Sequence, residues 1–224
     1  MDNMLSILVP TLNAEKYLAD SLAPLSAIAD EIIISDGGSR DATLRIAVGC
    51  GAILAVGQAG RGRQLARAAR FSRGDWLLFL HADTVLTGDW HEQIKTHMRT
   101  APDQAAYFRF CLNARGFRAR VMEYFVRLRS QVFALPYGDQ GLLISRTLYE
   151  QIGGYDERLD LFEDVAIIRK LGRKRLKGLS AKACTSAARY EQGGYFRRGL
   201  KNLILLRRYF KGASQQDLKK AYYS

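Results

Sequence analysis

Short apolar runs alternate with segments of helical spacing over about the first hundred residues of the chain. Strands and helices that alternate at this spacing are typical of a mostly parallel sheet with helices on both faces. The pattern therefore predicts an α/β fold. The apolar runs that predict strands are Leu5–Val9, Glu31–Ser35, Ala52–Val56 and Trp76–Leu80.

The segments between these runs predict helices. The first helix is expected to begin near Ala14, with Asn13 as its N-cap, because asparagine favours that position. The second is expected over Thr43–Val48. A turn rich in glycine and arginine, Gly57–Arg63, is expected to precede the third, which passes through Leu65–Ala69.

Polar residues follow each of the four predicted strands. In a parallel sheet these loops open on one edge, where ligands collect. Carboxylates there can bind hydroxyls, base edges or a metal ion, and guanidinium groups suit phosphate. Each loop alone is also ordinary turn chemistry, but the four together indicate a nucleotide site. Strand by strand, the candidates are Pro10, Thr11, Asn13 and Glu15; Asp36, Gly37, Gly38 and Ser39; Gly60, Arg61, Gly62, Arg63 and Gln64; and His81 and Asp83.

The second half of the chain adds further acidic candidates. Asp139 precedes a short apolar run, Leu142–Ser145, and is either a substrate contact or a turn aspartate. Glu163 and Asp164 come just before an apolar segment that is typical of the buried start of a helix. A carboxylate there is stabilised by the helix N-terminus whether or not it is catalytic, so position alone leaves both readings open.

The net charge of +12 arises entirely in the second half of the chain. Residues 1–112 contain 11 Lys+Arg and 12 Asp+Glu, whereas residues 113–224 contain 23 and 10. This asymmetry indicates an anionic partner. No nucleic-acid-binding motif accompanies the charge, so nucleic acid is not the expected partner.

Two segments combine the basic charge with aromatic and aliphatic residues, Arg115–Phe133 and Tyr195–Lys211. Each segment has two readings. A basic amphipathic helix is typical of attachment to an anionic membrane surface. The other reading is a helix packed on a core or at a homodimer interface, with its arginines in solvent.

Cysteine usage and hydropathy bear on the compartment. The three cysteines are odd in number and far apart along the chain, which suggests neither a disulfide framework nor a metal cluster. The N-terminus lacks the features of a signal peptide, and no apolar run has the length of a membrane span. We therefore expect a cytoplasmic protein, peripheral at the inner face of the membrane if the basic segments bind lipid.

The ordered motifs resemble those of family 2 glycosyltransferases. Leu5–Asn13 and Ile32–Thr43 are similar to the opening of that family, Leu77–Asp83 to its acidic metal motif, and Phe162–Asp164 to its later Glu-Asp motif. With Gly60–Gln64 and Tyr137–Gly141 in the same order, the set most closely resembles a compact bacterial subgroup, the radical-SAM/selenodomain-associated transferase 2 proteins. The resemblance runs from Leu5 to about Tyr209.

The resemblance implies a Rossmann-like GT-A fold that binds a nucleotide-diphosphate sugar, usually a UDP-sugar. Asp36 would accept hydrogen bonds from the uracil edge, and the main chain near Pro10 and Thr11 would complete the nucleoside pocket with Glu15. Arg61 and Arg63 would lie near the base or the diphosphate. The full set assigned to the donor is Pro10, Thr11, Asn13, Glu15, Asp36, Gly38, Arg61, Arg63, Gln64, His81 and Asp139.

The resemblance also implies a metal cofactor, Mn²⁺ or Mg²⁺, and a catalytic base. Asp83 matches the last acid of the family's Asp-x-Asp motif and would bind the metal. His81 replaces the first acid; a neutral imidazole can donate to a ribose hydroxyl or bind Mn²⁺, but is a poor ligand for Mg²⁺. Asp164 would be the general base that deprotonates the acceptor hydroxyl.

The expected function is metal-dependent transfer of a sugar, with inversion, to an unidentified acceptor that is anionic or lipid-linked. Residues 1–192 would form the transferase domain, with a donor half over 1–112 and an acceptor half over 113–192. Residues 193–224 would form a basic helical extension.

Two rival functions stay open. One is a sugar-phosphate nucleotidyltransferase, although the glycine-rich phosphate loop expected near its N-terminus is replaced here by Pro10–Asn13. The other is a non-catalytic protein that binds a membrane or a polyanion on a degenerate transferase fold. The histidine at position 81 keeps this second alternative open.

Overall fold

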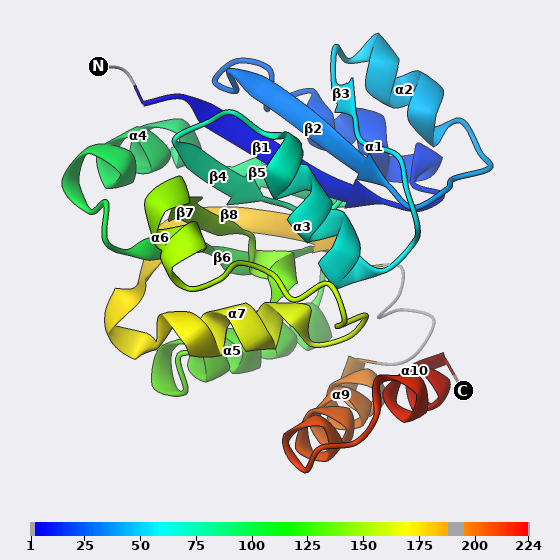
Figure 1. The fold of residues 1–224 in the computed structure, drawn as a ribbon. Helices are drawn as coiled ribbons and strands as arrows, with labels where there is room; N and C mark the ends of the chain where they lie inside the picture. Colours follow the sequence, from blue (N-terminus) through cyan, green and yellow to red (C-terminus); the bar gives the residue numbers. More distant parts are fainter. Residues whose placement is uncertain (1–2, 188–194, 224) are drawn as a thin grey trace.

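The computed structural model describes residues 3–187 and 195–223. Within them, eight strands form one sheet (Figure 1). In chain order these are β1 (Leu5–Thr11), β2 (Glu31–Asp36), β3 (Ile53–Leu54), β4 (Trp76–Phe79), β5 (Thr84–Thr87), β6 (Ala105–Asn113), β7 (Leu142–Ser145) and β8 (Leu176–Ser186).

Helices connect and flank the strands. They are α1 (Glu15–Leu22), α2 (Thr43–Gly49), α3 (Arg61–Phe71), α4 (Trp90–Thr100), α5 (Phe117–Val132), α6 (Arg146–Gln151), α7 (Glu163–Leu171), α9 (Tyr195–Phe210) and α10 (Gln215–Tyr223). Two short 3-10 turns, η1 (Gly138–Gln140) and η2 (Arg173–Arg175), precede β7 and β8.

The strand order is β3-β2-β1-β4-β7-β6-β8-β5. The first four strands in this order are mutually parallel. β7 is antiparallel to β4 and β6, and β8 is parallel to β6 and antiparallel to β5. The predicted α/β fold, with a mostly parallel sheet flanked by helices, is confirmed.

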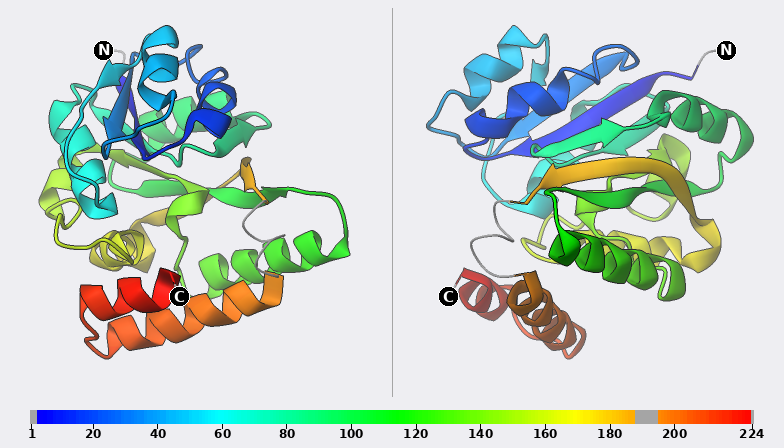
Figure 2. Two further views of the ribbon diagram at one scale, coloured as in Figure 1. Left: turned by 90° about the vertical axis from the view of Figure 1, so that its right-hand side faces the viewer. Right: turned by 180° about the vertical axis from the view of Figure 1, so that it is seen from behind.

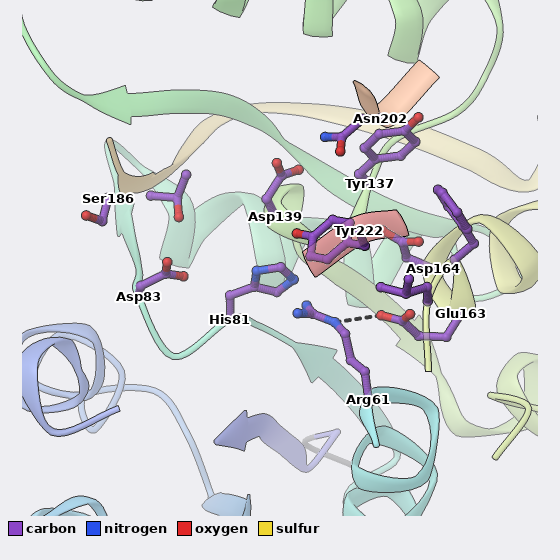
Figure 3. A pocket seen from close by; sticks show the side chains of 13 residues that line it. Arg61, His81, Asp83, Tyr137, Asp139, Glu163, Asp164, Ser186, Asn202 and Tyr222 are labelled. Atoms are coloured by element: carbon purple, nitrogen blue, oxygen red, sulfur yellow. Dashed lines mark ion pairs between the residues drawn. The ribbon is translucent and has the colours of Figure 1, made fainter. Parts of the chain in front are cut away.

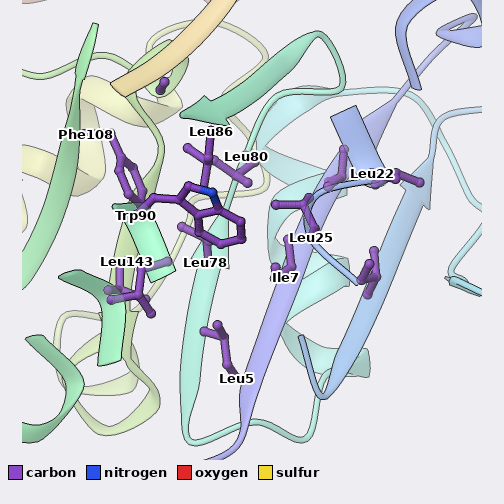
Figure 4. Packing of buried hydrophobic residues seen from close by; sticks show 14 of the residues in the cluster. Leu5, Ile7, Leu22, Leu25, Leu78, Leu80, Leu86, Trp90, Phe108 and Leu143 are labelled. Atoms are coloured by element: carbon purple, nitrogen blue, oxygen red, sulfur yellow. The ribbon is translucent and has the colours of Figure 1, made fainter. Parts of the chain in front are cut away.

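The parallel strands are buried on both faces, as continuous apolar runs require. Successive residues of β1 point to opposite cores: Ile7 and Val9 pack under α1, α2 and α4, whereas Leu8 packs under α3, α6 and α7. On the first face, Trp90 of α4 lies among side chains such as Leu78, as Figure 4 shows. Helices on both faces were expected from the alternating pattern, and the two cores bear this out.

A separate cluster lies at the second half of the sheet. Phe110 and Leu112 of β6 pack against Ala119 and Met122 of α5. The C-terminal helices α9 and α10 pack against each other, and α9 also contacts α5. The three helices lie at the same end of the molecule (Figure 2). In the described part of the chain, no helix has both the length and the apolar character needed to cross a bilayer.

The structure corrects the predicted start of the first helix. α1 begins at Glu15, and no side chain caps it. Asn13 is not the N-cap: it has a left-handed φ of 52°, and its Oδ1 accepts a hydrogen bond from the N–H of Arg40. Asparagine tolerates this conformation better than most residues, which explains its presence at a sharp bend between strand and helix.

Two other predicted boundaries are also wrong. The third strand was expected over Ala52–Val56, whereas β3 covers Ile53–Leu54, although the N–H groups of Ala55 and Gly57 still donate to the carbonyl groups of Ile34 and Asp36. The turn expected over Gly57–Arg63 ends earlier, at Gly60, whose φ of 142° is accessible to glycine. Arg61 therefore lies on the first turn of α3.

Candidate active site

A pocket of about 170 Å³ lies where β4 and the first turn of α3 meet the second half of the sheet (Figure 3). It brings together five of the predicted site residues, which come from distant parts of the sequence: Arg61, His81, Asp83, Asp139 and Asp164. The other lining residues are Tyr137, Leu161, Phe162, Glu163, Thr185, Ser186, Asn202 and Tyr222.

A short contact between Arg61 and Glu163 crosses the pocket. Arg61 Nε lies 2.6 Å from Glu163 Oε1, and the Glu163 side chain is only 3% exposed. Burial raises the pKa of Glu163 to about 8; Arg61 opposes this rise, and the neighbouring Asp164 adds to it. Burial would lower the pKa of Arg61, but attraction to Glu163 and Asp164 outweighs it and raises that pKa. Arg61 therefore stays a cation inside an acidic pocket.

Asp164 is held by two backbone donors. Its Oδ2 accepts the N–H of Gly138 at 2.7 Å, and its Oδ1 accepts the N–H of Val165 at 2.7 Å. Phe162, two residues earlier, has a left-handed φ of 64°, which is uncommon for an aromatic residue. These contacts orient the carboxylate, and each of its oxygens keeps a lone pair for a further donor.

Gly138 is the point on which three pocket side chains converge. A Cβ atom at this position would lie 2.8 Å from His81 Nε2, 3.3 Å from Arg61 Nη2 and 3.4 Å from Asp164 Oδ2. A larger residue would displace at least the imidazole. The glycine therefore allows the histidine, the guanidinium and the carboxylate to approach the same short turn.

Asp139 is a second acid whose environment is unusual. Burial raises its pKa to about 6; Arg129 opposes this rise, and Asp164 adds to it. Its Oδ1 is buried and has no hydrogen-bond partner among the described residues. Arg129 itself lies over the ring of Tyr137, 3.4 Å from its centroid. A buried carboxylate oxygen without a partner is suited to accept a hydrogen bond from a hydroxyl group of a ligand.

The side chains of the pocket that could bind a metal ion also bear on the expected cofactor. In the part of the chain that the structure describes, no three His, Cys, Asp or Glu side chains are grouped closely enough to hold a metal ion by themselves. Asp83 and His81 both line the pocket. A magnesium-type cation is commonly held by one or two carboxylates together with substrate phosphates. The residues therefore fit a cation that binds together with a diphosphate.

Asp36 lies outside the pocket, at the end of β2, and is fully buried. Its carboxylate accepts hydrogen bonds from the hydroxyls of Thr11 and Ser39 and from the N–H groups of Gly38 and Ser39. Burial acts to raise the pKa of Asp36, but these hydrogen bonds lower it overall. The carboxylate therefore organises this loop, and its contact with a base stays a prediction.

Other residues of the predicted nucleotide site lie at the same edge of the sheet. Pro10 pairs with Ser35 across β1 and β2. Glu15 Oε2 accepts the N–H of Ala42. Gln64 is buried, and its Nε2 donates to the carbonyl groups of Thr11, the last residue of β1, and Ser35, near the end of β2, at 2.7 and 2.9 Å. Much of the predicted nucleoside loop is thus fixed before any ligand binds.

Two arginines of α3 have structural partners. Arg63 Nη2 lies 3.1 Å from Asp160 Oδ1, so the structure directs Arg63 toward the loop before α7 and not into the pocket. Arg67, which the sequence did not single out, donates to the carbonyl groups of Asp36 and Ala55. The Arg67 contacts fix the ends of the strands that carry the predicted nucleoside loop.

The C-terminal helices contribute residues that sequence reasoning missed. Tyr222 of α10 lies among the pocket side chains, and Asn202 of α9 lines the same space (Figure 3). Gln215 Oε1 accepts the N–H groups of Asp160 and Leu161 at 3.1 and 3.0 Å, and Tyr209 stacks on Phe162. No local pattern marks Tyr222. The predicted boundary at 192/193 lies outside the described residues.

Gly62 offers a test of how α3 is positioned. A Cβ atom at this buried position would overlap the carbonyl oxygens of Asp156 and Leu159, which are backbone atoms. Gly62→Ala is therefore expected to lower the free energy of unfolding by about 1–3 kcal/mol. Urea denaturation measures this change. The matched control is Gly49→Ala in α2, where a Cβ meets nothing within 4 Å. Equal stability of the two variants would contradict the packing described here.

The fold and the pocket together define a class of protein. Carboxylates and a guanidinium lie beyond a parallel strand of an α/β sheet, next to loops fixed by buried hydrogen bonds, which is the arrangement of a nucleotide-dependent enzyme. The sequence profile described as Glycosyl transferase family 2 matches residues 6–151, more than half of the chain. The chain belongs to glycosyltransferase family 2, whose enzymes transfer a sugar from a nucleotide-sugar donor.

Solved structures support the same fold. TarS 1-349 from S. aureus, in complex with UDP, has a TM-score of 0.62 at 18% identity over 98% of this chain and 69% of that one. Glucosyl-3-phosphoglycerate synthase from Mycobacterium tuberculosis, with Mn²⁺, UDP and glucosyl-3-phosphoglycerate, has a TM-score of 0.57 at 21% identity over 82% and 71%.

The mannosyltransferase PcManGT from Pyrobaculum calidifontis, in complex with GDP-Man and Mn²⁺, has a TM-score of 0.62 at 15% identity, over 82% of this chain and 57% of that one. Comparison with curated protein sequences gave no match. At these identities the structural likeness establishes the GT-A fold.

Proposed function

We propose that the protein is a metal-dependent, inverting glycosyltransferase that moves a sugar from a UDP-sugar to the hydroxyl of an anionic or lipid-linked acceptor. The observation that carries the proposal is the convergence of Arg61, His81, Asp83, Asp139 and Asp164 in one pocket. The similar structures that hold UDP, one of them with Mn²⁺, support the choice of nucleotide and metal.

The donor would bind with its diphosphate near Asp83 and Arg61. Asp83, with His81 beside it, would hold Mn²⁺ or Mg²⁺; when bound, such a cation neutralises the charge that develops on the departing diphosphate. Arg61, held 2.6 Å from Glu163 Oε1, adds a fixed positive charge, because its pKa is raised and burial raises the pKa of Glu163 to about 8. Asp36 and its loop would hold the base, and His81 can donate to a ribose hydroxyl.

The acceptor side of the reaction requires a base. Asp164 deprotonates the acceptor hydroxyl in this proposal, on the face of the sugar opposite the departing diphosphate. The N–H groups of Gly138 and Val165 keep its carboxylate in place during this step. Asp139, with its unpartnered buried oxygen, binds a hydroxyl of the transferred sugar.

Residues of the C-terminal half would form the acceptor side. Tyr137, Asn202 and Tyr222 line the pocket together with the proposed base. The basic excess of residues 113–224 favours an acceptor with negative charge. Membership of the radical-SAM/selenodomain-associated transferase 2 subgroup, and a cytoplasmic location at the inner face of the membrane, are part of this proposal. They rest on the order of the sequence motifs and on the basic segments.

A thermal-shift screen tests donor and metal together. UDP-, GDP- and TDP-sugars are added with Mn²⁺ or Mg²⁺. A UDP-sugar with Mn²⁺ at about 100 times its Kd is expected to raise the Tm by roughly 5–10 °C. Asp83→Asn is expected to abolish the part of this shift that requires the metal, because it removes the carboxylate ligand.

The matched control is Asp103→Asn, which changes an exposed loop carboxylate outside the pocket and should leave the donor shift unaltered. A wild-type protein that responds to none of the sugar nucleotides with either metal would disprove the proposed function. A full metal-dependent shift in Asp83→Asn would remove Asp83 from the metal site.

A further inference from the structure

Helix α5 has apolar residues on two opposite faces. Ala119, Met122 and Val126 are buried against β6. At 100° per residue, a second apolar stripe falls on the opposite side of the helix. Its members are exposed, and Phe117 is the most exposed at 82%; they are Phe117, Tyr124, Phe125, Leu128 and Val132. In the described part of the chain, these side chains belong to none of the buried apolar clusters.

Helix α9 repeats the arrangement. Leu205 and Leu206 are buried, and Asn202 on the same side lines the pocket. Leu200 and Leu203 on the other side are 60% and 53% exposed, and the adjacent Ile204 is also exposed. α9 contacts α5, and both helices lie at the same end of the molecule (Figure 2), so the two helices with exposed apolar residues are neighbours.

Basic side chains border these apolar faces. Arg118 lies at one edge of the exposed apolar stripe of α5, and Arg127 lies at the other edge. Both side chains are exposed. On α9, Arg207 and Arg208 are exposed beside the leucines, and the helix contains no acidic residue. Long basic side chains beside exposed aromatic and aliphatic residues are typical of helices that lie in the headgroup region of an anionic bilayer.

The charge pattern distinguishes a membrane from other occupants. Two copies of this surface would bring arginines against arginines, which costs free energy in an interface. Nucleic acid would satisfy the arginines, but it would leave aliphatic residues such as Leu128 and Leu200 in water. An anionic lipid surface satisfies both groups, because phosphate binds the cations and acyl chains cover the apolar side chains.

We propose that the exposed faces of α5 and α9 dock the enzyme on the surface of an anionic membrane. Arginines at the edges of the two faces bind lipid phosphates, while Phe117, Phe125 and Leu200 enter the boundary between headgroups and acyl chains. α9 then joins the membrane surface to the pocket, since Asn202 lies on its inner side. This arrangement suits an acceptor that is carried on a lipid, and it stands independently of which sugar nucleotide the enzyme uses.

Co-sedimentation with vesicles tests the proposal. The full chain is expected to bind vesicles of phosphatidylcholine with phosphatidylglycerol, to bind pure phosphatidylcholine vesicles much less, and to dissociate as salt is raised. Phe117→Ser combined with Phe125→Ser should lower the partition coefficient about tenfold or more. Arg118→Gln combined with Arg127→Gln should reduce the salt dependence but not abolish it, because Arg207 and Arg208 of α9 are retained.

The matched control is Phe71→Ser, which changes a residue of α3 that is 56% exposed, close to the 54% of Phe125. It should leave vesicle binding unaltered. All variants should keep the thermal shift with the donor, which separates failure of docking from failure of the proposed chemistry. Absence of binding to anionic vesicles would overturn the proposal. So would light scattering that shows a dimer which the serine substitutions dissociate, because the surface would then be a homodimer interface.

Discussion

Replacing Asp164 with asparagine is expected to lower kcat about 10²–10⁴-fold while leaving the affinity for the sugar nucleotide unchanged. Asparagine has the same shape and keeps one oxygen that can accept the Gly138 N–H, but its NH2 group cannot accept the Val165 N–H, so circular dichroism and the unliganded Tm should be measured to show that the variant is folded. Asparagine cannot take a proton from the acceptor hydroxyl. Until the acceptor is identified, slow hydrolysis of the donor, in which water replaces the acceptor, measures kcat, and calorimetry measures donor affinity.

Asp139→Asn is the matched comparison, because Asp139 is another carboxylate of the same pocket. If Asp139 binds a sugar hydroxyl, its substitution raises KM or the donor Kd more than it lowers kcat. Full hydrolysis by Asp164→Asn together with loss of kcat in Asp139→Asn would assign the base to Asp139. Both acids line the pocket, so this pair of variants decides between them.

The second large effect concerns stability. The free energy of unfolding of the ligand-free protein is expected to fall as the pH rises from about 4.5 to about 8. Over this range the folded chain keeps a proton on Glu163, whereas the unfolded chain has released it. The stabilisation is complete below the ordinary pKa of 4.5 and is lost by about 8, a difference of up to about 5 kcal/mol. Glu163→Gln should remove the part of the fall that comes from Glu163 and leave the smaller part that comes from Asp139, whose pKa burial raises to about 6, as measured by urea denaturation at several pH values.

Glu157→Gln serves as the control, because Glu157 is an exposed glutamate whose side chain is 47% accessible. It should leave the pH dependence unchanged. The distance of 2.6 Å between Arg61 and Glu163 is that of a charged pair, whereas burial favours the protonated acid. A pH profile that is identical in wild type and Glu163→Gln would mean that the pair stays charged throughout and that burial does not dominate.

The strands that position the donor edge were predicted almost to the residue. β1, β2 and β4 extend over the expected apolar runs with shifts of one or two positions, because each run is buried on both faces and needs no distant partner to be recognised. β6 and β8 were not predicted. Their burial alternates along the strand, and their register shifts between Tyr107 and Arg109, so their sequences do not carry a continuous apolar signal.

The candidate site was predicted in part for a similar reason. His81 and Asp83 follow a strand directly, and Arg61 follows a short edge strand, so the rule for parallel sheets brings them together. Gln64, one turn later on the same helix as Arg61, is buried instead, because its amide donates to the carbonyl groups of Thr11 and Ser35. Whether a polar side chain at the edge faces the ligand or the backbone depends on such local hydrogen bonds, which the sequence does not specify.

By itself, the sequence determined the α/β order, the chemistry at the carboxyl ends of the strands and the family, because these depend on local periodicity and on the order of motifs. Only the tertiary structure decided which distant groups meet. It paired Arg61 with Glu163, about a hundred positions apart, and brought Tyr222 into the pocket. It also made Cys111 a register partner of Cys184, although the cysteines are far apart in the chain. Such contacts depend on how the chain closes over long distances, and a one-dimensional pattern of apolar and polar residues carries no record of that closure.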